Sequence, residues 1–177
     1  MKYYQLLFVF VINITFLQAQ DGNINSNNLE SNLKSSAQTM GQLFIENKLT
    51  EYVKFVHPKI IDMLGGQDKM IEVLNKSIKQ IESEGFTFKN VTIGDPSKII
   101  TVTNELQSVV PQILELKNKS GSLTVTSYLL GISNDNGKTW YFIDTGGKTL
   151  EQMKKVFPTL SNELIIPPKK QPVFIND

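Results

Sequence analysis

The apolar positions of the chain follow two different periods, and the change comes near residue 86. Before that point they recur every three or four residues, the spacing of one face of an α-helix. The pattern predicts a helix over 29–44, a short one over 50–57 that must end before Pro58, and a third over 68–85. Residues 59–66 add about two helical turns between the last two, ended by a glycine pair.

After residue 86 the sequence is rich in Val, Ile, Thr, Phe and Tyr, and it partly alternates between apolar and polar residues, as strands do. Five strands are expected, over 86–93, 98–103, 105–117, 122–132 and 139–144. Pro111 cannot donate to a ladder, so we expect it at a sheet edge or at a bulge. A short helix over 148–157 and an extended, Pro-rich surface tail over 158–177 complete the chain.

Helices followed by strands with short turns predict a single α+β domain over 29–157, in which the helices pack on a curved antiparallel sheet. The element order, with stretches such as FVHPKIIDMLGGQDKMIEVL and GKTWYFID, resembles the NTF2-like (SnoaL-like) cone within the cystatin-like class. The chain also resembles small exported bacterial proteins of unassigned function. Such cones usually place a short helix among the first strands, and none is expected between Val91 and Leu106. The resemblance implies a cavity between the helices and the sheet.

The first twenty residues have the pattern of a secretory signal peptide. Lys2 precedes the apolar run LLFVFVINITF, which is too short to span a bilayer, and Ala19 offers a small residue for cleavage. A polar leader over 21–28 is expected to be flexible. The mature protein is therefore predicted to be exported, to the periplasm or outside the cell, with no transmembrane anchor after cleavage.

Composition removes several classes of function. The absence of cysteine excludes thiol nucleophiles and thiolate metal sites. All 18 basic residues are lysines and nearly balance 17 acidic residues, so no basic face for nucleic acid is expected. Without arginine, the bidentate fork that often holds phosphates is also missing. One histidine and no acidic cluster predict no metal site, and no cofactor is expected.

Residues 133–140, SNDNGKTW, match the Asp box that is repeated through the propellers of sialidases. A propeller needs several copies, and this chain has one, with no arginine to hold a substrate carboxylate. We therefore interpret the stretch as a hairpin turn. Ser133, Asp135 and Gly137 provide turn chemistry, and Trp140 packs beside them.

His57 is the only histidine, so it would carry any general-base step near neutral pH. Asp62 or Asp144 would orient it, which makes His57, Asp62 and Asp144 the candidate catalytic residues. The competing interpretation is structural: His57 ends a helix, where the helix dipole favours a positive charge.

A second candidate set concerns a ligand pocket. Four residues from helix and strand segments that are expected to face each other are candidates for its lining: Tyr52, His57, Tyr128 and Asp144. Strand parity is the argument for turning Tyr128 and Asp144 inward, toward the helices.

Three functions remain open. The favoured one is an exported, non-catalytic domain that binds a small apolar ligand or a protein partner, in a cavity of a few hundred Å³ between the third helix and the sheet. The first alternative is a small-molecule isomerase, dehydratase or hydrolase that uses His57 with a carboxylate. The second alternative is a structural envelope module that forms a homodimer through its sheet face.

Overall fold

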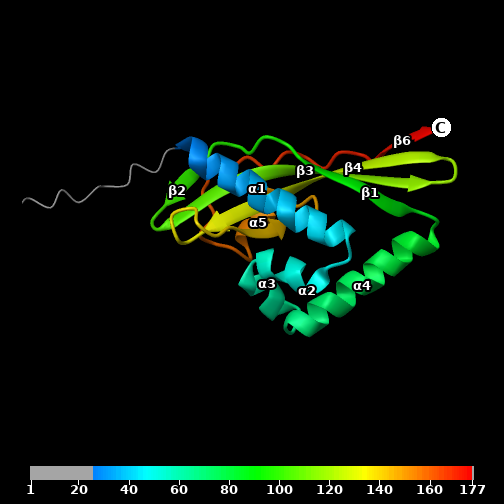
Figure 1. Cartoon of the computed structure of the whole chain (residues 1–177). Helices are drawn as coiled ribbons and strands as arrows, with labels where there is room; N and C mark the ends of the chain where they lie inside the picture. Colours follow the sequence, from blue (N-terminus) through cyan, green and yellow to red (C-terminus); the bar gives the residue numbers. More distant parts are fainter. Residues whose placement is uncertain (1–25, 177) are drawn as a thin grey trace, which may run out of the picture.

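The apolar faces predicted before residue 86 do form helices in the computed structural model of the chain, which describes residues 26–176 (Figure 1). The helical elements are α1 (Ser26–Ile45), α2 (Leu49–Tyr52), the 3-10 turn η1 (Val53–Phe55), α3 (Pro58–Met63) and α4 (Gln67–Ser83). The predicted stop before Pro58 is confirmed, because η1 ends at Phe55 and α3 begins at the proline. A missing N–H is harmless at the first helical position.

Helix α1 begins earlier than the sequence pattern predicts. A flexible leader is expected over 21–28, but its last three residues, 26–28, belong to the first turn of α1. Leu29 in this turn packs against the main core cluster, and such tertiary packing supplies most of the stability of helices in proteins. The predicted signal peptide over 1–20 and the rest of the leader lie outside the described residues.

Within the described part of the chain, six strands form one antiparallel sheet: β1 (Thr87–Ile93), β2 (Ile100–Val102), β3 (Glu105–Asn118), β4 (Gly121–Ser133), β5 (Tyr141–Asp144) and β6 (Val173–Asn176). The long strands β3 and β4 pair from Leu106–Ser133 to Asn118–Gly121. Each carries two short strands on its other flank, β1 and β2 beside β3, and β5 and β6 beside β4. The predicted α+β class, with N-terminal helices on a curved antiparallel sheet, is confirmed.

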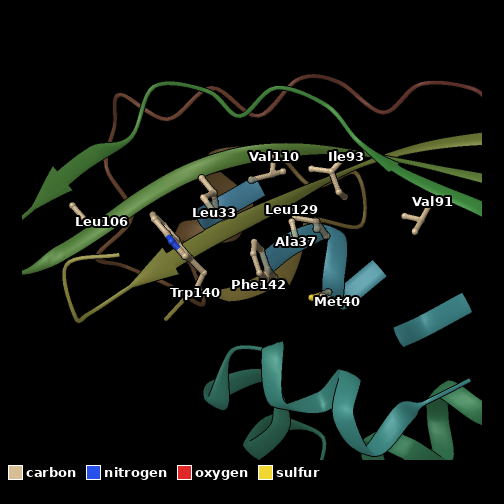
Figure 2. Close-up of a cluster of buried hydrophobic side chains, with 10 residues drawn as sticks. All are labelled: Leu33, Ala37, Met40, Val91, Ile93, Leu106, Val110, Leu129, Trp140 and Phe142. Atoms are coloured by element: carbon tan, nitrogen blue, oxygen red, sulfur yellow. The ribbon is translucent and has the colours of Figure 1, made fainter. Parts of the chain in front are cut away.

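One face of the sheet packs on α1, and Figure 2 shows the buried side chains between them. Two glycines allow the close approach. A Cβ on Gly131 would lie 2.8 Å from Cδ1 of Leu33, and one on Gly41 would lie 2.7 Å from Cγ2 of Val91. The cluster comprises Leu33, Ala37, Met40, Val91, Ile93, Leu106, Val110, Leu129, Trp140 and Phe142.

The other face of the sheet is covered by the C-terminal part of the chain. Helix α5 (Leu150–Lys154) and the segment after it bury Met153, Phe157, Leu160 and Leu164. Their partners on the sheet are Val109, Tyr128, Leu130, Ile132 and Ile143. The segment after residue 157 therefore differs from the expected surface tail, because two leucines four residues apart fill the second core cluster. Beyond Leu164 the chain runs over the surface, with Ile166 still packed against this cluster, and reaches β6, whose four side chains are all exposed.

Pro111 pairs with Tyr128 of β4 without a register shift, so the expected bulge is wrong, and β3 is not an edge strand of the sheet, although no strand pairs with Pro111 on its other side. Its carbonyl accepts the N–H of Gly94, just beyond the end of β1. Since the N–H and C=O of a strand residue point to the same side, the missing donor faces the gap between β1 and β2. There Ser97 replaces the ladder, because its N–H donates to the carbonyl of Val109 and its Oγ accepts the N–H of Val109.

Candidate functional site

A cavity of about 300 Å³, the inner cavity, lies between α4 and the edge strand β5. It is the place where the sequence predicts a cavity between the third helix and the sheet. Its wall is apolar over most of its extent, because buried faces of three helices meet the end of β5 there. The apolar side chains are Met40, Phe44, Val56, Ile60, Met70, Leu74, Phe142 and Ile143.

Tyr52 and Asp144 are the two polar side chains that line the inner cavity. Desolvation raises the pKa of the Tyr52 hydroxyl, and the negative charge of Asp144 raises it further, so the phenol stays protonated. Among residues 26–176, no side chain or main-chain group forms a hydrogen bond with this hydroxyl. Tyr52 is half-buried, and a ligand in the cavity can supply an acceptor for this donor.

The Asp144 carboxylate is open to solvent on one side and crowded by protein on the other. Desolvation raises its pKa, while the N–H of Gly146 and the charge of Lys148 oppose that shift. The Gly146 N–H donates to Oδ1 at 2.7 Å. The second carboxylate oxygen has no hydrogen-bond partner in the described part of the chain, so it can accept from a ligand.

A second hollow of about 340 Å³, the outer groove, lies between α3 and α5. Ile60 and Met63 from α3 face Met153 from α5, while Lys148 and Gln152 form a polar rim. The inner cavity and the outer groove share three lining residues, Ile60, Ile143 and Asp144. The two spaces are therefore neighbours, separated by these three residues where β5 ends beside α3.

The segment before α3 pairs with β5 only as far as Phe142, and this leaves the end of β5 open beside the two spaces. Val56 forms a parallel bridge with Phe142, and the N–H of His57 donates to the carbonyl of Phe142 at 3.0 Å. Pro58 has no N–H and begins α3, so this pairing stops at Phe142. The last residues of β5 are left with an open outer edge.

His57 is the N-cap of α3 and not the end of the preceding helix. Its Nδ1 accepts the N–H of Lys59 at 3.2 Å, and its ring packs edge-on against Phe157 and Tyr141. Desolvation lowers the pKa of the imidazole; the charge of Glu105 raises it and that of Lys59 lowers it. The sequence-based interpretation of a cation at a helix C-terminus is therefore wrong, because the dipole at a helix N-terminus disfavours positive charge.

The candidates predicted from the sequence do not converge on one site. Tyr128 is buried under α5, on the opposite face of the sheet from Asp144, because Asp144 pairs with the neighbouring residue Leu129. Asp62 lines a separate hollow of about 360 Å³. In residues 26–176 no hydrogen bond joins His57 to a carboxylate. Of the four predicted pocket residues, the structure brings Tyr52 and Asp144 together in one cavity.

The Asp-box residues form the turn between β4 and β5. Asp135 Oδ1 accepts the N–H of Thr139 and the hydroxyl of Ser133, each at 2.8 Å, and the Gly137 N–H donates to Ser133 Oγ at 2.9 Å. Gly137 has a φ of 79°, which favours glycine. Trp140 is buried in the core beside the turn. The stretch holds a hairpin and lines neither the inner cavity nor the outer groove.

Sequence reasoning missed Ile60 and Lys148 as lining residues. Ile60 lies in a short helix that follows a proline, and its exposure to two cavities leaves no mark in the apolar period. Nothing in the sequence around Lys148 distinguishes it from the other 17 lysines of the chain. Met70 and Leu74 were recognisable as residues on the apolar face of α4, but the pattern cannot separate a core position from a cavity wall.

Within residues 26–176, no group of three or more His, Cys, Asp or Glu side chains is arranged to hold a metal ion. The same residues include no helix that is both long enough and apolar enough to cross a bilayer. Comparison of the chain with models of protein families, with curated proteins and with solved structures found no match.

Proposed function

We propose that this domain binds a small, largely apolar molecule in the inner cavity and does not convert it chemically. The observation that carries the proposal is the cavity itself, a space of about 300 Å³ walled by eight apolar side chains and two polar ones. Ligand pockets commonly have such a composition, in which a few polar groups fix the orientation of the ligand.

The arrangement of polar groups favours binding over catalysis. His57 uses its Nδ1 to cap α3, and it lines neither the inner cavity nor the outer groove. General-base catalysis needs the base within hydrogen-bond reach of the reacting group. Tyr52 and Asp144 can hold a polar group of a ligand, and the desolvated phenol is a donor rather than a base.

The test is binding of the fluorescent probe N-phenyl-1-naphthylamine, an apolar aromatic amine whose emission rises in apolar surroundings. The native protein is expected to bind it in the micromolar range, with an increase in melting temperature as the probe concentration rises. Leu74→Trp places a large ring into the inner cavity and is expected to abolish the signal.

Val73→Trp is the matched control, because Val73 lies on the same helix, is 50% exposed and does not line the cavity. This variant is expected to bind the probe like the native protein. Absence of probe binding by the native protein, or equal binding by the folded Leu74→Trp and Val73→Trp variants, would contradict the proposed function.

A further inference from the structure

The inner cavity and the outer groove lie on opposite faces of the sheet and are neighbours around the end of β5. Phe142 and Asp144 turn their side chains toward the α1 face, and Ile143 turns its side chain toward α5. Ile60 of α3 forms the opposite wall of both spaces. A ligand that occupies both spaces would have to pass between Ile60 and the end of β5, which we call the passage.

Main-chain groups of β5 line this passage. The carbonyl of Phe142 points away from β4 and accepts the N–H of His57, whereas the N–H of Thr145 points toward β4 and donates to Tyr128. Because main-chain groups alternate between the two sides of a strand, the N–H and C=O of Asp144 also point away from β4. No group among residues 26–176 forms a hydrogen bond with them on that side. The passage thus presents one open donor and one open acceptor, as at an unpaired sheet edge.

Two side-chain groups add to the same pattern. The Tyr52 hydroxyl is a donor without a partner, and the free oxygen of Asp144 is an acceptor without one. The middle of the combined site therefore offers donors and acceptors in equal measure, whereas its two ends are apolar. At the inner end lie Met70 and Leu74, and at the outer end lies Val156.

The chemistry of the passage distinguishes between polar groups that a ligand could place there. An ester has an acceptor but no donor, and would leave Asp144 unpaired. A carboxylate brings a second negative charge beside Asp144, which Lys148 on the solvent side offsets only in part. A secondary amide has one N–H and one C=O, which match the acceptors and donors of the passage.

We infer that the two spaces form one site, and that its ligand is an elongated, uncharged molecule with a secondary amide between two apolar arms, such as an N-acylated alkylamine. The inference rests on the proposed function and extends it by naming the class of ligand. The amide pairs with Asp144 in the passage, one arm enters the inner cavity, and the other arm lies in the outer groove.

The test compares three molecules with twelve carbon atoms each: N-hexylhexanamide, its ester analogue hexyl hexanoate, and dodecanoate. Each competes with N-phenyl-1-naphthylamine for the native protein. The amide is expected to bind about tenfold more tightly than the ester, because a bound ester covers the free oxygen of Asp144 without giving it a donor, and an acceptor that loses its hydrogen bond in this way costs about this much. Equal affinity of amide and ester, or tighter binding of dodecanoate, overturns the inference while the proposed function stands.

A pair of variants tests the role of Asp144. Asp144→Asn keeps an oxygen for the N–H of Gly146 and replaces the free acceptor by an NH₂ donor. The preference for the amide over the ester is expected to fall to about threefold or less, since the main chain of residue 144 still pairs with the ligand. Asp62→Asn, at the separate hollow, is expected to keep the native preference. If Asp144→Asn keeps the native preference for the amide over the ester, the Asp144 carboxylate does not pair with the amide.

A second pair tests whether the ligand reaches the outer groove. Val156→Trp fills the groove, whereas Lys155→Trp changes an exposed neighbour that does not line it. Only Val156→Trp is expected to weaken N-hexylhexanamide, by about tenfold, and both variants are expected to bind the probe normally. Two results would contradict a site made of two spaces. In one, Val156→Trp loses affinity for the probe as well as for the amide; in the other, it keeps the native affinity for the amide.

Discussion

His57 and Phe157 pack edge to face with their ring centroids 5.1 Å apart, and this contact joins the start of α3 to the segment after α5. The same imidazole caps α3 through its Nδ1, which accepts a hydrogen bond only when that nitrogen carries no proton. The position of α3, and with it one wall of the outer groove, therefore depends on a neutral His57.

Acid is expected to destabilise the protein through His57. Its native pKa lies below the ordinary histidine value of about 6.5, so the unfolded chain takes up the proton first. The stability present above that value is lost as the pH falls toward the native pKa. His57→Asn retains a capping acceptor but does not titrate. Urea unfolding from about pH 7 to about pH 5 is expected to show the native protein losing stability relative to this variant. A difference that does not change with pH would contradict the assignment.

Asp144 is expected to show the opposite dependence. Its native pKa is raised by desolvation, so the stability gained on protonation is present at low pH and is lost as the pH rises through that pKa. Asp144→Asn is therefore expected to be more stable than the native protein near neutral pH, by less than about 1 kcal/mol because the group is partly exposed. The gain should vanish in acid. Chemical unfolding at several pH values measures it, and a less stable variant at neutral pH would show that the carboxylate is not strained.

The Asp-box turn is expected to matter for stability and not for binding. Asp135→Ala removes the acceptor for the Thr139 N–H and the Ser133 hydroxyl, at a cost of about 1 to 2 kcal/mol. Asn134→Ala, an exposed neighbour, is the control and is expected to be nearly neutral. Thermal unfolding compares the two, and the affinity for N-phenyl-1-naphthylamine should be native in both. A selective loss of probe binding in Asp135→Ala would assign the turn a functional role.

Strand β6 is expected to detach without unfolding the rest of the protein. A Cβ on Gly121 would lie 2.1 Å from the carbonyl oxygen of Ile175, so Gly121→Ala forces β6 away from β4. The side chains of β6 are exposed, and Phe174 contacts Phe86 edge to face, so the loss of β6 removes this contact and little other apolar burial. Hydrogen exchange is expected to show lost protection over 173–176 with a nearly unchanged melting temperature. Retained protection, or a large fall in melting temperature, would mean that β6 is held by more than its pairing.

Local periodicity predicts the helices and the first five strands, but neither β6 nor the way the faces of the elements combine. The apolar residues of 68–85 share one face and therefore predict a helix, and α4 covers nearly that range. Parity shows only that neighbouring strand residues face opposite ways. The pairing of Leu129 with Asp144 decides that Tyr128 lies under α5, and this pairing depends on the length of the turn before β5.

Two further differences have equally local causes. His57 precedes a proline, and a residue before proline can end one helix or begin the next. Leu160 and Leu164 stand among prolines and polar residues, so no periodic signal marks them as core. The resemblance to NTF2-like cones stays a prediction, as does dimerisation through a sheet face. Export also stays a prediction, because the signal peptide on which it depends is outside the described residues.

The close packing of Leu33 against the backbone at Gly131 sets a constraint on biosynthesis. A ribosome releases the N-terminal segment first, yet the surface that receives α1 is made of strands translated much later. The face of the sheet opposite α1 stays uncovered until Leu160 and Leu164 leave the ribosome. The nascent polypeptide is thus expected to lack a complete native core until Leu164 has been synthesised, a delay during which chaperones have exposed apolar segments to bind.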